Sequence, residues 1–183
     1  TYMFNDVGDY SVYASYNGMD SEIIQISVFP TPLEFKKNVL VEDFTGTWCG
    51  WCPRVSYAIK LLKDQEADVS FVAIHNGDQM AINGEASIRQ FFGINSFPTA
   101  LINRQSTWSG SQPGNLGQVT AEIGKKSYSS VAIESSLDGR ELSVTIKLKM
   151  GFSYDRIRLG LFLLEDGLVY KQSNYTSYYA DIT

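Results

Sequence analysis

The first thirty residues alternate apolar and polar side chains with the two-residue period of β-strands. Tyrosine, valine and alanine occupy alternate positions between residues 10 and 16, with Ser11, Tyr13 and Ser15 between them. Asn17-Gly18 favours a tight turn, after which residues 24 to 28 repeat the alternation. The pattern predicts a hairpin. Because two strands cannot bury a core alone, we expect it to belong to a larger β module or to pack on another part of the chain.

A different pattern follows a proline-containing stretch. Pro30 and Pro32 cannot donate to a β ladder, so the residues around them are predicted to form a linker. Strands and helices then alternate. We expect strands at residues 38–44, 69–75, 98–103 and 106–109, and helices at residues 49–67, 85–93 and 116–123. The order β-α-β-α-β-β-α predicts a parallel strand pair with right-handed crossovers, closed by an antiparallel pair.

After about Ser127 the sequence returns to a β pattern. Asp138-Gly139 and Asp166-Gly167 each lie between alternating runs, and each predicts the turn of a hairpin. We therefore divide the chain into three predicted parts. They are residues 1–31, a β hairpin with its linker; residues 32–127, an α/β domain; and residues 128–183, a β-rich domain that we expect to continue beyond this chain.

Composition narrows the class of protein. Hydrophobic residues make up 44% of the 183 residues and charged residues 19%, which is typical of a globular chain. The net charge of −5 and the lack of a basic run with aromatics argue against nucleic acid as a partner. No apolar run is long enough to cross a bilayer. The chain opens without a methionine or a signal segment, which suggests a mature or trimmed piece.

The stretch GTWCGWCPR, residues 46–54, holds both cysteines of the chain, Cys49 and Cys52. They lie at the start of a predicted helix that follows a predicted buried strand. Three interpretations compete. A zinc site needs about four ligands, and only His75 and carboxylates could join the two sulfurs. A purely structural disulfide across so short a loop would add little stability. A redox pair is the interpretation that we favour.

The position of the two cysteines predicts different roles for them. Unpaired N–H groups and the helix dipole at a helix N-terminus stabilise a thiolate, so we expect a lowered pKa and nucleophilic attack at Cys49. Cys52, one turn further on, can attack the mixed disulfide that Cys49 forms. That second step releases the partner and leaves a Cys49–Cys52 disulfide.

Two segments at this separation resemble the signatures of the thioredoxin family. VLVEDFTGTWCGWCP resembles its active-site strand, loop and helix, and INSFPTALIN resembles its cis-proline loop and the following strand. The resemblance covers about residues 37–126 and implies a thioredoxin fold. GDYSVYASYNG at residues 8–18 resembles the last strands of immunoglobulin-like modules. With these flanks, EDFTGTWCGWCPR resembles more narrowly the thioredoxin-like outer-membrane lipoproteins of Bacteroidetes-type bacteria.

The thioredoxin resemblance implies roles for further residues. Pro98 is the expected cis-proline facing the cysteine pair, and a cis bond would turn the backbone of Phe97 toward Cys49, where an extended substrate could pair with it. Asp43 lies where thioredoxins have a buried acid that helps to deprotonate the resolving thiol. A solvated acid at the strand end, or an inward-pointing Glu42, is the alternative.

The residues around the pair are the expected substrate contacts. Trp48 resembles the tryptophan that shields such sites, with a core tryptophan as the alternative. Gly50-Trp51 departs from the Gly-Pro of typical thioredoxins and leaves the reduction potential open. Arg54 could add positive potential near Cys49 or be a solvated surface residue. His75 could approach the site from its strand end or simply cap that strand.

The sequence predicts an extracytoplasmic thiol:disulfide oxidoreductase in the periplasm or at the outer membrane or cell surface. Having only paired cysteines suits an oxidising compartment. We expect a protein or small-molecule thiol or disulfide as the partner, no cofactor and no metal, and membrane attachment only through an upstream lipid anchor. The alternative is a cell-surface binding or adhesion lipoprotein, in which a thioredoxin-like scaffold carries a non-catalytic disulfide.

Overall fold

The computed structural model describes residues 8–28, 34–110, 112–151 and 158–179. Contacts between residues divide the chain into two compact units. Unit 1 consists of residues 1–35 and 127–157, and unit 2 consists of residues 36–126 and 158–183. The predicted linker around Pro30 and Pro32 lies outside the described residues, and the predicted boundaries at residues 31 and 127 stay a prediction.

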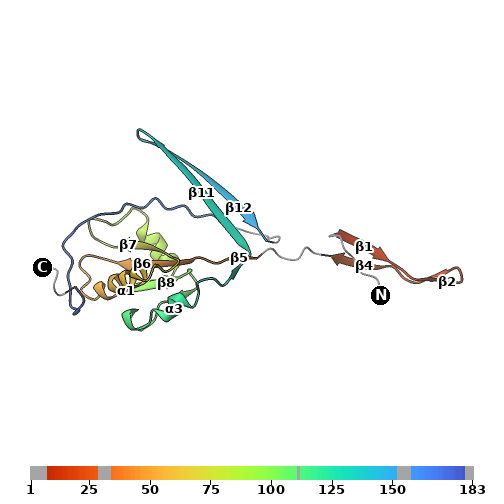
Figure 1. The fold of residues 1–183 in the computed structure, drawn as a ribbon, viewed down its shortest axis with the longest axis horizontal. Helices are drawn as coiled ribbons and strands as arrows, with labels where there is room; N and C mark the ends of the chain where they lie inside the picture. Colours follow the sequence, from red (N-terminus) through yellow and green to blue (C-terminus); the bar gives the residue numbers. More distant parts are fainter. Residues whose placement is uncertain (1–7, 29–33, 111, 152–157, 180–183) are drawn as a thin grey trace. The chain divides into compact units, whose positions relative to one another are not determined.

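Unit 1 contains two separate hairpins (Figure 1). In the first, β1 (Gly8–Val12) pairs antiparallel with β4 (Ile24–Val28), and β2 (Ser15–Tyr16) pairs with β3 (Met19–Asp20). Asn17 and Gly18 both have positive φ, as a two-residue hairpin turn requires. In the second hairpin, β11 (Ser129–Asp138) pairs with β12 (Glu141–Met150) around the predicted turn at Gly139.

Unit 2 is built on a four-stranded sheet with the order β7-β6-β8-β9. The central strand β6 (Val39–Thr45) pairs parallel with β7 (Val69–His75) and antiparallel with β8 (Thr99–Ile102). The short strand β9 (Ser106–Thr107) closes the other edge. Two-residue strands, β5 (Phe35–Lys36) and β10 (Lys126–Ser127), lie where the chain enters and leaves this sheet region.

The helices of unit 2 lie between and after these strands. They are α1 (Pro53–Asp64), α2 (Glu85–Phe91), α3 (Gly117–Thr120) and the 3-10 turn η1 (Gln112–Gly114). Helix α1 is shorter than the predicted 49–67, because residues 49–52 form turns before Pro53, and Glu66 adopts a positive φ beyond its end. None of the helices in the described ranges is both long and apolar enough to cross a membrane.

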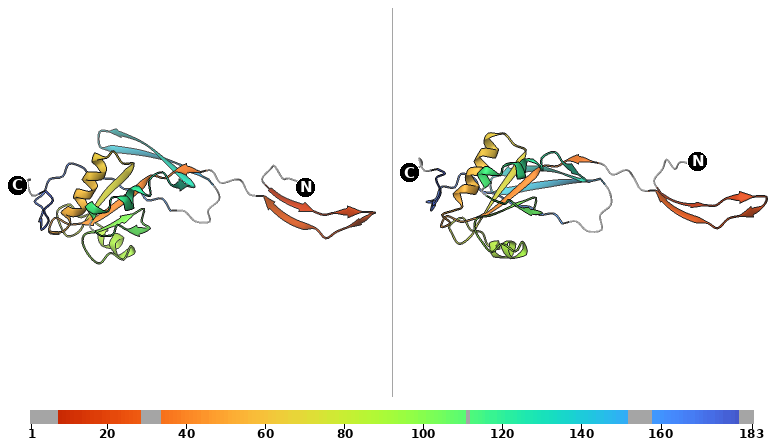
Figure 2. Two further views of the ribbon diagram at one scale, coloured as in Figure 1. Left: turned by 60° about the horizontal axis from the view of Figure 1, so that its bottom comes forward. Right: turned by 90° about the horizontal axis from the view of Figure 1, so that it is seen from below.

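Strand alternation gives unit 2 two apolar cores, one on each face of the sheet. Figure 2 shows α1 and α2 on opposite sides of the strands. Odd-numbered Val39 and Val41 pack with α1 in the first core, and even-numbered Phe44 packs in the second. The buried members of the first core are Val39, Val41, Val55, Ala58, Leu62, Ala100, Ile102, Trp108 and Val119; those of the second are Phe44, Ile74, Ile94 and Leu101.

The predicted second hairpin at Asp166-Gly167 is wrong. Residues 158–175 form no strand, and the described segment runs along unit 2 (blue in Figure 1). Contacts on either side of the turn hold its two arms apart. Phe162 packs against the Arg104 guanidinium, 5.3 Å from its ring centroid, whereas Gln172 donates to the backbone of Cys49. These long-range contacts replace the ladder that alternation alone predicted.

Candidate active site

A disulfide joins Cys49 and Cys52 at the N-terminal end of α1. The S–S distance is 2.07 Å and the two Cα atoms are 5.4 Å apart. Cys52 is the N-cap of the helix, and the loop before it is closed by hydrogen bonds from the Cys49 N–H to the Gly46 carbonyl and from the Cys52 N–H to the Cys49 carbonyl. The first helical turn holds no acidic residue. The positive end of the helix dipole stabilises negative charge that develops on a sulfur here.

The Phe97–Pro98 peptide bond is cis, as expected. The Trp48 ring joins this loop to the cysteine loop: it contacts the Phe97 ring edge-on with 5.3 Å between centroids. Its Nε1 also donates to the Asn76 carbonyl at 2.7 Å. The ring is 48% exposed, so Trp48 is a surface residue beside the disulfide and not a core tryptophan.

Glycine at position 46 makes room for this tryptophan. A Cβ atom there would lie 2.6 Å from Trp48 Nε1 and 3.1 Å from the Asn76 carbonyl oxygen. The first distance is shorter than packing allows, and the second is a tight contact with a backbone atom. The residue type at this position therefore fixes where the Trp48 ring can lie.

Strand alternation separates the two acids of β6, and both are buried. Glu42 points to the α2 face, where Arg104 donates to it from two nitrogens at 2.6 and 2.8 Å. Asp43 points to the α1 face and has no such partner: its Oδ1 is buried without a hydrogen bond. Burial raises the pKa of Asp43 to about 7, against a lowering by the positive charge of Arg54. Asp43 is therefore a buried acid whose proton can exchange near neutral pH.

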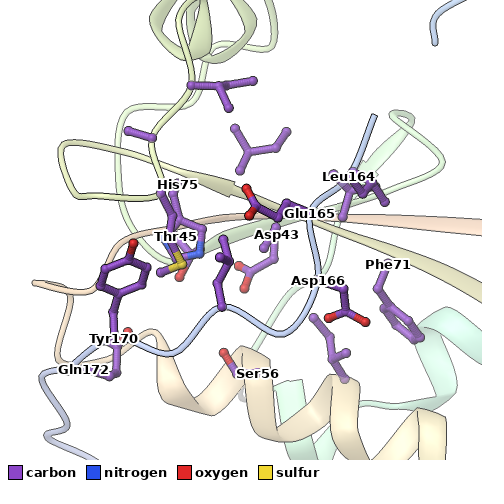
Figure 3. A pocket seen from close by; sticks show the side chains of 18 of the residues that line it. Asp43, Thr45, Ser56, Phe71, His75, Leu164, Glu165, Asp166, Tyr170 and Gln172 are labelled. Atoms are coloured by element: carbon purple, nitrogen blue, oxygen red, sulfur yellow. The ribbon is translucent and has the colours of Figure 1, made fainter. Parts of the chain in front are cut away.

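Asp43 lies in an open groove within unit 2, shown in Figure 3. The groove has a volume of about 1360 Å³ and runs between α1, β7 and the segment of residues 162–172. Other polar groups that line it include Thr45, Ser56 and His75. The groove gives solvent a route to a carboxyl group that the sheet and helix otherwise enclose.

His75 is linked to the cysteine loop through the carboxylate of Asp78. Its Nδ1 is 2.8 Å from Asp78 Oδ2, which also accepts the Thr47 N–H at 2.7 Å, while the Met80 N–H donates to Oδ1. Burial opposes ionisation of Asp78, but the hydrogen bonds from His75, Thr47 and Met80 outweigh it and hold the Asp78 pKa below its ordinary value. No motif in the sequence singles out Asp78.

The remaining predicted residues divide between the loop and the helix. Gly50 and Trp51 contact the segment of residues 172–179, which sequence reasoning also missed. Arg54 is only partly exposed, with its Nε buried and unpaired, so it is not a fully solvated surface residue. The described residues contain no group of three histidine, cysteine or acidic side chains that could hold a metal ion. The two cysteine sulfurs are bonded to each other in the structure.

Comparison with solved structures relates this chain to three proteins. HBP35 of Porphyromonas gingivalis matches with a TM-score of 0.51 and 24% identity over 63% of this chain and 43% of that one. A structural-genomics protein from Agrobacterium tumefaciens matches with a TM-score of 0.42 and 21% identity, covering 59% of this chain and 55% of that one. Oxidised thioredoxin O2 from Arabidopsis thaliana matches with a TM-score of 0.38 and 21% identity, covering 48% of this chain and 76% of that one.

The match to HBP35 is a likeness of fold at low identity, and this chain spans less than half the length of that protein. A search of curated proteins found no match. A family model described as outer membrane protein Omp28 matches residues 85–182, which is more than half of the chain. The match includes Pro98 and residues 172–179 but not the two cysteines.

The family description places the chain outside the cytoplasm, at the outer membrane or in the periplasm, as the sequence predicted. This chain, with its thioredoxin-like fold and its Cys49–Cys52 disulfide, belongs to the Omp28 outer membrane protein family.

Proposed function

We propose that this chain is an extracytoplasmic thiol:disulfide oxidoreductase in which Cys49 is the nucleophile and Cys52 the resolving thiol. The observation that carries the proposal is the closed Cys49–Cys52 disulfide at the N-terminal end of α1, beside the loop that contains the cis-proline. The pair stores two electrons when reduced, so the exchange itself needs no cofactor.

In the reducing direction, the Cys49 thiolate attacks one sulfur of a substrate disulfide, and the other substrate sulfur leaves as a thiolate. The Cys52 thiolate then attacks the Cys49 sulfur of the mixed disulfide, which releases the second substrate thiolate and forms the Cys49–Cys52 disulfide. Two electrons pass from the pair to the substrate. In the oxidising direction, the same bonds form and break in reverse order.

In this proposal, Asp43 accepts the proton of the Cys52 thiol. Cys52 is 1% exposed, so its thiol needs an internal base before it can attack. A carboxyl group with a pKa of about 7 is partly ionised at neutral pH and can accept that proton. The proton then passes from Asp43 to solvent through the groove that Asp43 lines. Asp43 acts through Cys52, so it is a proton acceptor and not a residue that holds substrate.

Two features of the site suit a protein substrate. Among the described residues, neither the backbone N–H nor the carbonyl of Phe97 forms a hydrogen bond, so both are available to an extended strand. Trp48 and Trp51, which precede Cys49 and Cys52 in turn, are about half exposed and offer apolar surface next to the cysteines. We therefore propose Trp48, Gly50, Trp51 and Phe97 as the substrate-contact surface.

Trapping a mixed disulfide tests the proposal. The wild-type chain should reduce or oxidise a test disulfide such as insulin. Cys52→Ser should hold a covalent partner through Cys49, and Cys49→Ser, the matched control, should hold none. Absence of exchange by the wild type together with absence of trapping by Cys52→Ser would favour the alternative, a binding protein with a non-catalytic disulfide.

The direction of exchange follows from one further measurement. The pair is equilibrated with glutathione buffers, and the fraction of oxidised protein is measured at each ratio. A reduction potential near about −270 mV indicates a reductant, and one near about −120 mV indicates an oxidant.

We also propose that the two hairpins of unit 1 are parts of immunoglobulin-like modules of a surface lipoprotein. Each hairpin exposes apolar side chains within the described residues, such as Ile24 in β4 and Ile133 and Leu137 in β11. Such faces are normally covered by a second sheet. A structure of a longer natural chain would test this, and hairpins left without a facing sheet there would contradict it.

A further inference from the structure

Residues 172–179, which we call the strap, lie against the loop that carries the cysteines. The Ser173 N–H donates to the Thr47 carbonyl at 2.8 Å, and the Tyr175 N–H donates to the Gly50 carbonyl at 2.7 Å. The two donors are alternate residues of the strap, and the two acceptors are three positions apart in the loop. The strap therefore fills two backbone acceptors that a bound peptide could otherwise use.

A side chain adds to this backbone pairing. Gln172 Nε2 donates to the Cys49 carbonyl at 2.9 Å and lies 3.3 Å from the Gly46 carbonyl. Both carbonyls also accept a hydrogen bond within the loop, from the Cys49 and Cys52 N–H groups, so Gln172 adds a further donor to the loop. The amide of Gln172 thus fixes the register of the strap on the loop, with its point of attachment at the nucleophilic cysteine itself.

The Tyr175 ring occupies the space left by the glycine of the active-site dipeptide. A Cβ atom on Gly50 would lie 2.3 to 2.5 Å from three carbons of that ring, so alanine could not fit here with the strap in place. The same ring meets Trp51 edge-on with 6.0 Å between centroids. Gly50 and Trp51 together form the surface that the Tyr175 ring contacts.

The far end of the strap is anchored on α1. The Tyr178 ring stacks on Tyr57 with 4.8 Å between centroids, and the Tyr179 ring meets Tyr57 edge-on at 5.5 Å. Between the two ends, the Asn174 side chain accepts the Thr176 N–H and donates to the Tyr178 carbonyl. The strap is thus fixed on both sides of the disulfide.

The result is a covered nucleophile. Cys49 is only 5% exposed, although an attacking thiolate has to reach a disulfide in another molecule. The opposite wall, the Phe97 backbone, remains open among the described residues. One edge of the site is therefore free, and the other is filled by the chain's own residues.

We infer that the strap is an internal substrate mimic that closes the Cys49 site, and that it must leave before an extended polypeptide can bind along residues 47–50. This inference rests on the proposed exchange reaction and names its substrate class. The polypeptide would donate backbone N–H groups to the Thr47 and Gly50 carbonyls and place an aromatic side chain on Gly50 and Trp51.

The test compares the wild type with the double variant Gln172→Ala/Tyr175→Ser and with Val169→Ser as the control. Val169 precedes the strap by three positions, is 90% exposed and does not line the Asp43 groove. Each protein is reduced, freed of reductant and treated with iodoacetamide, and the rate of Cys49 alkylation is measured against pH. Insulin reduction by dithiothreitol is followed with the same proteins.

Loss of an aromatic contact and of a side-chain hydrogen bond should raise the fraction of molecules with a detached strap about tenfold or more. We expect the plateau rate of alkylation to rise by that factor in the double variant and the KM for insulin to fall. The midpoint of the pH profile should stay unchanged, because access and not thiol acidity is altered. The control should match the wild type.

Hydrogen exchange of the wild-type chain tests the strap without any substitution. The Ser173 and Tyr175 amides should exchange about tenfold or more slowly than unfolded amides. Exchange at the unfolded rate, or equal alkylation of all three proteins, overturns the inference even if the wild type reduces insulin. Faster alkylation of the double variant, with no protein reducing insulin, supports the covering strap and defeats the proposed function.

Discussion

Replacing Asp43 by asparagine should stabilise the folded protein at alkaline pH. Asparagine keeps the shape of the side chain and removes the ionisable proton. In the wild type, burial raises the Asp43 pKa from 3.8 to about 7, so that ionising this group costs more free energy in the folded chain than in the unfolded one. The Oδ1 atom has no hydrogen-bond partner that asparagine would lose.

The sign follows from proton linkage. The folded chain binds the Asp43 proton more tightly, so the folded state carries no penalty below pH 3.8, where both states are protonated. The penalty grows as pH rises and is complete above the folded pKa of about 7. A rise of about 3 units, at about 1.4 kcal/mol for each unit, corresponds to about 4 kcal/mol. Because the effective dielectric constant of a folded protein exceeds that of a dry interior, we expect a smaller cost of about 2 to 4 kcal/mol.

Urea unfolding of the oxidised protein at pH 4, 6 and 8 measures the effect. The difference in unfolding free energy between Asp43→Asn and the wild type should be smallest at pH 4 and largest at pH 8. Glu42→Gln is the control, because it weakens the ion pair with Arg104 and should destabilise the chain at neutral pH. A stability difference between Asp43→Asn and the wild type that is constant from pH 4 to pH 8 would refute the raised pKa.

Two further predictions concern the loop around the disulfide. Asp78→Asn should lower the free energy of unfolding by about 1–3 kcal/mol at pH 7, because the carboxylate accepts hydrogen bonds from His75, Thr47 and Met80. Since the Asp78 pKa lies below 3.8, the difference from the wild type should shrink only in stronger acid, and urea unfolding at pH 7 and pH 2 measures it. Gly46→Ala should displace the Trp48 ring and increase its quenching by acrylamide, whereas Gly117→Ala, at a position with open space, should leave quenching unchanged.

Local patterns predicted the parts of the site that depend on neighbouring residues. Alternation in β6 placed one acid on each face of the sheet, and the spacing of Cys49 and Cys52 predicted the disulfide that the structure contains. Alternation could not tell which acid would find a cation. Glu42 is neutralised by Arg104, more than sixty positions away, and this pairing leaves Asp43 as the acid without a partner.

Contacts between distant residues left no signal in the sequence. Asp78 binds Thr47 across thirty-one positions, and Gln172 binds Cys49 across 123. Neither pair shares a helix or strand whose period could reveal it. The same distant contacts explain the wrong hairpin at Asp166-Gly167, because a turn signal predicts pairing only when nothing else holds its two arms.

The strap changes the meaning of the Gly50-Trp51 dipeptide. From sequence, these two residues are expected substrate contacts whose departure from Gly-Pro leaves the reduction potential of the cysteine pair open. In the structure, Gly50 is the position where no side chain fits beneath Tyr175, and Trp51 is the ring that Tyr175 meets. A substitution in the dipeptide would therefore alter access to Cys49 together with its potential. Rates measured on such variants must be separated into these two contributions, for which thiol alkylation and glutathione equilibration are independent measures.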